Sequence, residues 1–129
     1  MATKLSGFIA YQTAEAWTWE HMAMTRARVI AGDPALTPKV EAAIREVLCT
    51  PRDRAKIATD VRDMRARIAA DKGTDKIWDM KQVRGGLVDL EFIAQHLQLI
   101  AAPSQPEVLD QNTLAALDRL ALAGLHAAA

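Results

Sequence analysis

The sequence lacks the residues that would suggest secretion or membrane insertion. It contains one cysteine, Cys49, in 129 residues, so it can form no internal disulfide and no thiolate metal site by itself. No apolar run approaches the length of a membrane span, and the N-terminal MATKLSGF has no basic segment followed by an apolar one. We therefore expect a cytoplasmic protein that does not contact a membrane.

The sequence also lacks net charge, because its sixteen basic and sixteen acidic side chains cancel. Broad capture of nucleic acid needs many lysines and arginines on one face, so we expect no nucleic-acid partner, although a local anion site remains possible. Half of the residues are apolar and a quarter are charged, which is typical of a globular chain. The length suits a single domain that spans residues 1–129.

Helical periodicity and local stop signals predict an all-α bundle of about five helices. Residues 8–31 carry apolar side chains at helical spacing without proline or glycine, which predicts one long first helix. Thr37-Pro38 and Thr50-Pro51 are start signals for the second and third helices. In the third, Ile57, Val61, Met64 and Ile68 form one buried face that ends before Gly73, and its charged side chains form a solvated face.

The second half of the chain completes the bundle. Residues 74–84 show no helical stripe, and Ile77, Trp78 and Met80 suggest an extended segment laid across the bundle. Residues 87–102 are apolar over most of the helix circumference, which predicts the central, most buried helix. A final helix is expected to begin with Asn112 as its cap.

The stretch KQVRGGLVDLEF, residues 81–92, is the first candidate site. A helix N-terminus exposes unpaired N–H groups, and Gly85 and Gly86 let another group approach them closely, while Lys81 and Arg84 add cationic donors. The simpler interpretation is that Gly86 is an N-cap, that Asp89 folds back onto the free N–H groups and that Gly85 relieves a turn. Asp89 would repel a phosphate unless a metal ion or a basic residue lay between them.

Glu20 is the second candidate, because it lies in a helical row of small residues, Ala16, Ala23 and Ala27. An unpaired carboxylate buried there would be costly, so we expect it to meet a backbone N–H or an arginine, with Arg84 or Arg26 as candidates. The neighbouring Trp17, Trp19 and Met22 are expected in the core. A structural Glu–Arg contact and one wall of a substrate cleft both remain open.

The sequence shows no catalytic or metal motif of its own. His21, His96 and His126 lie on different segments without Glu-x-x-His partners, so we expect no metal ligands. Ser6 and Ser104 have no histidine at motif spacing, and no Walker or dinucleotide glycine pattern is present. We therefore predict no catalytic residues in this chain.

The two candidate stretches carry a family resemblance. WTWEHMAMTRARVIAGD (17–33), the Arg52-Asp53 helix start, VRDMR (61–65) and KQVRGGLVDLEFIAQHLQL (81–99) together resemble glutamine synthetase adenylyltransferase over about residues 11–124. That resemblance implies a helical domain of the nucleotidyltransferase substrate-binding type, which is part of a longer bifunctional enzyme. One half of that enzyme transfers AMP from ATP to a tyrosine of glutamine synthetase, and the other half removes it by phosphorolysis. WTWEHMA is more similar to the adenylylating C-terminal half.

The resemblance also implies the partners and cofactors. The family's catalytic carboxylates lie on a β-sheet core with a Gly-Ser turn and an Asp-x-Asp pair, which are absent between Met1 and Ala129, so an upstream nucleotidyltransferase domain of the same chain is expected. The longer enzyme would use Mg²⁺ and ATP and would act with glutamine synthetase and the PII signal protein. This fragment alone is predicted to bind neither cofactor and to be inactive.

The related PII uridylyltransferases carry a similar glycine-pair-then-aspartate signature, so the resemblance implies that this corner faces the nucleotide or the acceptor protein. The residues expected there are Lys81, Arg84, Gly85, Gly86, Asp89, Glu20 and Arg26. An alternative is a non-catalytic docking module for glutamine synthetase or PII with no nucleotide contact. An unrelated helical protein would require the matched segments to be coincidental.

Overall fold

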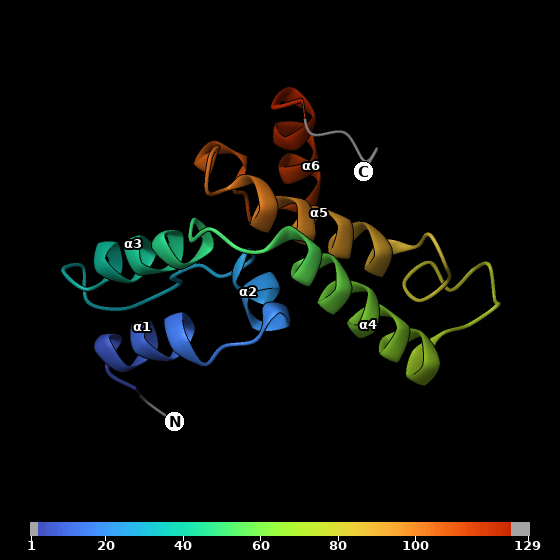
Figure 1. Ribbon diagram of the computed structural model, residues 1–129, viewed down its shortest axis with the longest axis horizontal. Helices are drawn as coiled ribbons and strands as arrows, with labels where there is room; N and C mark the ends of the chain where they lie inside the picture. The colour runs from blue at the N-terminus through green and yellow to red at the C-terminus, as the bar shows by residue number, and fades with distance from the viewer. Residues whose placement is uncertain (1–2, 125–129) are drawn as a thin grey trace.

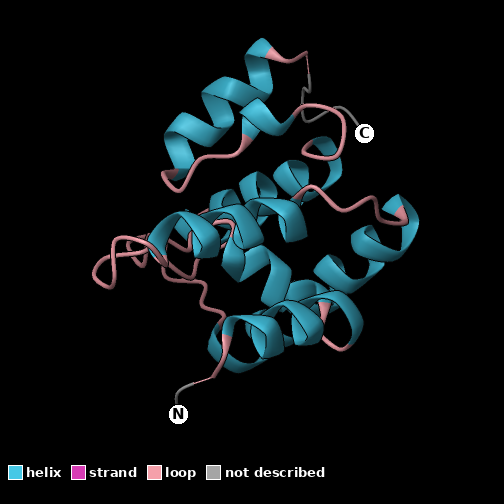
Figure 2. Ribbon diagram, turned by 90° about the vertical axis from the view of Figure 1, so that its left-hand side faces the viewer, coloured by secondary structure: helices cyan, strands magenta, loops and turns pink. Residues whose placement is uncertain are grey.

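The computed structural model describes residues 3–124, and this part of the chain is all-α as predicted, with no strand (Figure 2). The long helix predicted over residues 8–31 is two helices, the second of which ends at Met24, and residues 25–31 are not helical. There are thus six α-helices and one short 3-10 helix within 3–124 rather than about five. In chain order they are α1 (Leu5–Ala14), α2 (Thr18–Met24), α3 (Thr37–Leu48), α4 (Arg54–Lys72), α5 (Leu87–Ala101), η1 (Pro106–Val108) and α6 (Thr113–Leu122). None of these helices is both long and apolar enough to cross a membrane.

Helix α5 is the hub of the bundle, because α2, α4, α6 and η1 all pack against it (Figure 1). α1 and α3 lie side by side and pack on each other, and α2 links them to α4 and α5. The main core combines Met22 and Met24 of α2 with Leu48, Ile57 and Leu99 from the next three helices. Burial of these apolar side chains is the main stabilising force and fixes how the helices cross.

The predicted long first helix is interrupted at residues 15–17. The carbonyl of Tyr11 accepts the N–H groups of both Glu15 and Ala16, which ends α1. Trp17 is extended (φ −84°, ψ 160°), and its N–H donates to Glu20 Oε2 at 2.9 Å, which caps α2. The sequence has no proline or glycine here, so the prediction failed because a side-chain cap, not a helix breaker, separates the two helices.

Local caps set the later helix boundaries. α4 begins at Arg54 rather than at Thr50-Pro51, because Asp53 Oδ1 accepts the N–H groups of Ala55 and Lys56. Gly73 ends α4 and Asn112 caps α6, both as predicted. Side-chain acceptors at N-cap positions satisfy N–H groups that have no partner inside the helix.

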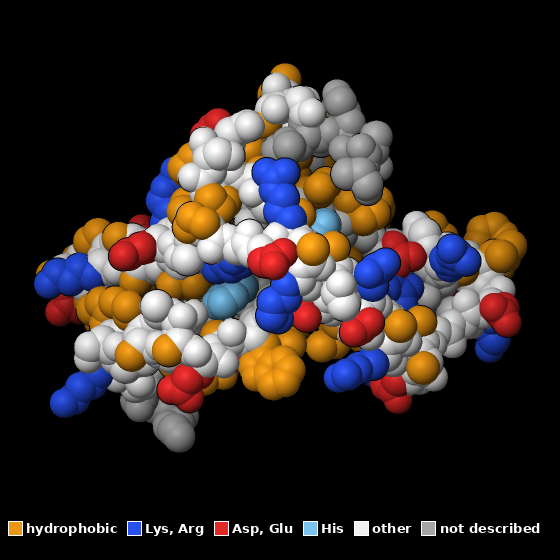
Figure 3. Space-filling model, viewed as in Figure 1, with side chains coloured by type: hydrophobic (Ala, Val, Ile, Leu, Met, Phe, Trp, Pro, Cys, Tyr) orange, Lys and Arg blue, Asp and Glu red, His pale blue; other side chains and the backbone are white. Residues whose placement is uncertain are grey.

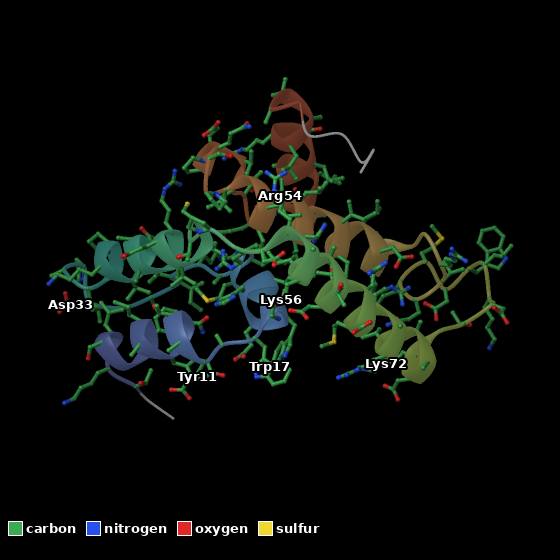
Figure 4. All side chains as sticks on the ribbon, in the orientation of Figure 1. Tyr11, Trp17, Asp33, Arg54, Lys56 and Lys72 are labelled. Carbon is green, nitrogen blue, oxygen red and sulfur yellow. The ribbon has the colours of Figure 1, made fainter. Side chains whose placement is uncertain are left out.

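Several aromatic and apolar side chains lie on the surface instead of in the core. Trp17 and Trp19 are exposed, so the prediction that they lie in the core was wrong, whereas Met22 is buried. Figure 4 shows Trp17 projecting from the turn between α1 and α2, on the same edge as Tyr11.

The segment 74–84 does not lie extended across the bundle. It is a series of turns in which the carbonyl and carboxylate of Asp79 accept the N–H groups of Gln82 and Val83, and Trp78 is 86% exposed. These local hydrogen bonds hold the turns in place, so no extended strand forms here.

Burial of α5 is also uneven along its length. Its second half is buried at Ala94, Gln98 and Leu99, as predicted for the central helix. Its first half exposes Leu87, Leu90 and Ile93, spaced three residues apart, to solvent. The prediction of the central, most buried helix therefore holds for the second half of α5 but not for the end that carries the glycine corner.

Candidate functional site

The glycine corner, residues 84–89, joins the turns of segment 74–84 to the first turn of α5. Gly86 is the N-cap, and a Cβ atom added to it would lie 2.5 Å from the carbonyl oxygen of Met80. Gly85 has a φ of 80°, a left-handed conformation that disfavours residues with a Cβ. Both glycines are therefore required by the local backbone, which confirms Gly86 as the cap and Gly85 as the turn residue.

The backbone N–H groups of the corner already have partners within the chain. Gly85 N–H donates to Asp89 Oδ2 at 2.5 Å, and Gly86 N–H donates to the Val83 carbonyl at 2.9 Å. Leu87 and Val88 donate to the carbonyls of Met80 and Lys81 at 2.9 and 3.3 Å. A phosphate bound to these N–H groups would have to displace these bonds, so the corner is not an open set of donors.

Asp89 connects the corner to α4. Its Oδ1 accepts a hydrogen bond from Arg65 Nε, while Oδ2 holds the Gly85 N–H. The bond from Arg65 holds the pKa of Asp89 below its ordinary value against the opposing effect of burial, and the Gly85 N–H and the charges of Arg65 and Arg84 lower it further. The carboxylate is thus ionised at neutral pH and fixes the start of α5 on α4.

Arg65 is the one contact of this corner that sequence reasoning missed. It was assigned to the solvated face of the third predicted helix, yet its side chain is 18% exposed. A signal was present, since Arg65 lies four residues after Val61 and next to Met64, at the flank of the buried stripe. The predicted solvated face is confirmed at Arg62, Asp63 and Arg67, which are exposed. It was wrong at Arg52, which is partly buried because its guanidinium donates to the carbonyls of Val47, Leu48 and Thr50.

The Arg65–Asp89 pair separates two hollows. The first, which we call the α4–α5 groove, has a volume of about 540 Å³. It is lined by Val61, Arg62, Arg65, Arg84, Gly85, Asp89, Phe92, Ile93 and His96. The second, of about 1150 Å³, lies between α4 and segment 73–84 and shares Arg65, Arg84 and Asp89 with the groove.

Two side chains that line the groove each carry one polar atom that is buried, with almost no exposed surface of its own, and that has no hydrogen-bond partner among residues 3–124. These atoms are Arg65 Nη1, a donor, and His96 Nδ1. Burial lowers the pKa of His96 below its ordinary value, so the ring is neutral at neutral pH and Nδ1 can donate or accept according to its tautomer. Unsatisfied buried polar atoms are uncommon in folded proteins and call for a partner.

Lys81 and Arg84 are exposed and, within the part of the chain that the structure describes, form none of the four ion pairs. Arg84 lines both hollows, whereas Lys81 lines neither. The corner therefore presents one arginine directly at the groove and one lysine beside it.

Glu20 and Arg26 lie apart from the corner and line neither hollow. Glu20 accepts from Tyr11 Oη at 2.8 Å and from Trp17 N–H at 2.9 Å, so the predicted contact with a backbone N–H is confirmed and the contact with Arg84 or Arg26 is not formed. These two bonds, from Trp17 first and Tyr11 second, lower the pKa of Glu20. Arg26 instead pairs with Glu91 of α5 at 2.9 Å, and both side chains are exposed.

The described residues bring together no three His, Cys, Asp or Glu side chains that could hold a metal ion. The groove is thus defined by arginines, one carboxylate, one neutral histidine and apolar walls. These groups can bind, orient and exclude water.

Comparison with known families matches two parts of the chain. Residues 1–43 match Glutamate-ammonia ligase adenylyltransferase, and residues 54–128, which include α4, the glycine corner and α5, match GlnD PII-uridylyltransferase. Both descriptions name nucleotidyltransferases, so this helical fold and its corner are of a type found in proteins of that class.

Curated relatives extend the match to the whole chain. It is 53% identical over 129 residues, 100% of this chain, to the bifunctional glutamine synthetase adenylyltransferase/adenylyl-removing enzyme of Rhodopseudomonas palustris (strain TIE-1). It is 52% identical over 118 residues, 92% of this chain, to the enzyme of that name from Bradyrhizobium sp. (strain BTAi1). The chain belongs to the glutamine synthetase adenylyltransferase family. It spans 13% and 12% of the length of these two relatives.

Proposed function

We propose that this chain is a helical substrate-binding and regulatory domain of an enzyme that transfers AMP from ATP to a tyrosine of glutamine synthetase, and so serves nitrogen control in the cytoplasm. The observation that carries the proposal is the 53% identity over the entire chain to an enzyme named for both adenylylation and its removal. The wording WTWEHMA in residues 17–23 supports assignment to the adenylylating C-terminal half.

The catalytic centre is proposed to lie in another part of the polypeptide, in a nucleotidyltransferase domain that precedes this one. That domain would supply the carboxylates for Mg²⁺, and the metal would clamp the phosphates of ATP and activate the attacking tyrosine hydroxyl. We expect the chain alone to transfer no AMP.

Within this domain we propose that the glycine corner faces the reaction partners. Arg84 and Lys81 supply unpaired positive charge, Asp89 holds the corner in place, and Gly85 and Gly86 allow the tight turn. Glu20 is proposed to position α2 through its cap, and the exposed Arg26 is a further candidate for contact with the acceptor protein.

A second candidate function is a docking module for glutamine synthetase or PII that never contacts the nucleotide. One observation favours it: the corner N–H groups that would hold a phosphate already donate within the chain. Titrating the chain with glutamine synthetase, with PII and with ATP and Mg²⁺ separately, observed by NMR of the Arg84 and Lys81 signals, distinguishes the two functions. Shifts with a protein partner alone indicate docking.

The test of the proposed function is AMP transfer from labelled ATP to glutamine synthetase by a longer polypeptide that contains this chain. We expect Arg84→Ala to lower transfer while helix content and thermal unfolding stay near those of the unaltered protein. The matched control is Arg67→Ala. Arg67 is also an exposed arginine, but it lies on α4 and lines neither hollow. No transfer by the unaltered polypeptide, or equal loss of transfer and stability in Arg84→Ala, would contradict the proposal.

A further inference from the structure

We propose that the α4–α5 groove docks an acidic segment of the acceptor protein, in which a carboxylate side chain lies next to a large apolar one. This inference rests on the proposed function and deepens it, because it names the chemistry that the acceptor presents to this domain. It assigns the site to protein contact rather than to the nucleotide.

The rim of the groove carries more positive than negative charge. Three arginines line the groove, Arg62, Arg65 and Arg84, against a single carboxylate. That carboxylate, Asp89, is already engaged by Arg65 and by the Gly85 N–H. The exposed Arg62 and Arg84 therefore leave the rim positive, although basic and acidic side chains alternate over the wider surface of α4 (Figure 3). A rim of this sign attracts acidic segments and repels basic ones.

The walls of the groove include apolar side chains that are open to solvent. Val61 and Phe92 are only partly buried, and Ile93 is 42% exposed, so an apolar surface is left open to solvent inside the positive rim. Leu90 and Leu87, which precede Ile93 on α5, are exposed as well. A hollow of about 540 Å³ has room for one large side chain and the backbone that carries it. A phosphate would gain nothing from these apolar walls.

Two buried atoms without partners indicate which polar group should lie beside the apolar side chain of the docked segment. Arg65 donates from Nε to Asp89, and its Nη1 is left buried without an acceptor. Because Arg65 Nη1 has almost no exposed surface, a carboxylate oxygen of the docked segment would reach it only after a small shift of the arginine side chain, and would then satisfy it with a charge-assisted hydrogen bond. His96 Nδ1 is buried in the same way, and after a similar shift it can bond a peptide N–H or C=O of the same segment.

A random-peptide display library selected on this chain tests the chemistry directly. We expect selected peptides to be enriched in Asp or Glu beside Leu, Ile or Phe, and to lose binding when those acids are changed to Asn or Gln. Binding of the best synthetic peptide should weaken as salt is added. An empty selection, or a selection without acidic residues, would overturn the proposal.

Variants locate the peptide in the groove. Reversing the rim charge with Arg62→Glu and Arg84→Glu together should lower the affinity for the peptide by roughly tenfold or more, because two favourable charge pairs become repulsive. Ile93→Asn should weaken it by a similar factor, while circular dichroism shows that each variant keeps its fold. Arg67→Glu and Leu122→Asn, which change an exposed arginine and an 88% exposed leucine outside the groove, are the matched controls. Equal effects of groove and control variants would overturn the assignment.

The longer polypeptide then tests whether the acceptor is the occupant. With Cys49 and the other native cysteines of the longer polypeptide changed to serine, a thiol placed by Ile93→Cys should react with a maleimide in the absence of glutamine synthetase and be protected in its presence. Protection without glutamine synthetase would show that the polypeptide covers its own groove and would overturn the proposal, as would reactivity that glutamine synthetase leaves unchanged. Because neither this labelling nor the peptide binding requires AMP transfer, failure here is distinguishable from failure of the proposed function.

Discussion

Arg65 on α4 and Asp89 on the first turn of α5 form an ion pair in which both side chains are about one-fifth exposed, at 18% and 21%. Through its second oxygen, Asp89 also holds the Gly85 N–H. One carboxylate thus sets the approach of two helices and the shape of the turn between the two hollows. The corner is therefore as much a structural joint as a candidate binding site.

The first prediction concerns this pair. Asp89→Ala should lower the free energy of unfolding by about 1–2 kcal/mol, because it leaves the partly buried Arg65 guanidinium and the Gly85 N–H without their acceptor. Urea denaturation followed by circular dichroism measures the change. A double-mutant cycle with Arg65→Ala should give a coupling energy of about 1 kcal/mol, whereas additive effects would show that the pair is not formed. Asp63→Ala, which changes an exposed aspartate on α4, is the control.

The second prediction is the pH dependence of stability. The pKa of Asp89 is lowered in the folded protein, mainly by Arg65, so its contribution is fully present above the ordinary aspartate pKa of about 4 and is lost as pH falls through the lower folded value. Urea unfolding at a series of acidic pH values should show this loss. Asp89→Asn should be less sensitive to acid over the same window, and an unchanged acid dependence would contradict the assignment.

The third prediction concerns the two glycines. Gly86→Ala should destabilise the chain by about 2 kcal/mol or more, because the new methyl group would lie 2.5 Å from one carbonyl oxygen and 2.8 Å from another. Gly85→Ala should cost about 1 kcal/mol, because the space is open but the left-handed backbone is unfavourable. Thermal unfolding measures both. Gly7→Ala in α1, where helix propensity favours alanine, should not destabilise, and the reverse order would contradict the corner geometry.

The fourth prediction concerns the exposed tryptophans. Trp78→Ser should change the free energy of unfolding by less than about 0.5 kcal/mol, because the side chain is 86% exposed. In the folded protein, acrylamide should quench tryptophan fluorescence almost as efficiently as in the unfolded chain, since Trp17 and Trp19 are exposed too. Strong protection from acrylamide would show that these side chains are covered.

Much of the fold was predictable because its signals are local. Gly86 at the start of α5, Gly73 at the end of α4 and Asn112 before α6 each act on their own backbone, so sequence alone located them. The interruption at Trp17 was missed because Glu20 does the capping through a side-chain contact, with no breaker in the sequence. Thr50-Pro51 looked like a helix start, but the Asp53 carboxylate is the better cap.

The candidate site was predictable only in part. Sequence placed Arg84, Gly85, Gly86 and Asp89 at one helix start, where the structure has them. The position of Arg65 beside Val61 and Met64 indicated partial burial, but its contact with Asp89, across 24 residues of sequence, was not predictable because it depends on how the helices cross. For the same reason the sequence did not show that Leu87 and Val88 would donate to the carbonyls of Met80 and Lys81, or that Arg26 would pair with Glu91. It did include Asp89 folding back onto a free N–H group and Glu20 meeting a backbone N–H, because both contacts are local.

The most direct test of the central claim, that the glycine corner faces the acceptor protein, is a comparison of kinetic constants for AMP transfer by the longer polypeptide with and without Arg84→Ala. We predict that the KM for glutamine synthetase rises several-fold while the KM for ATP is unchanged, because Arg84 belongs to the docking groove. A rise in the KM for ATP alone, or no change in either constant, would contradict the account.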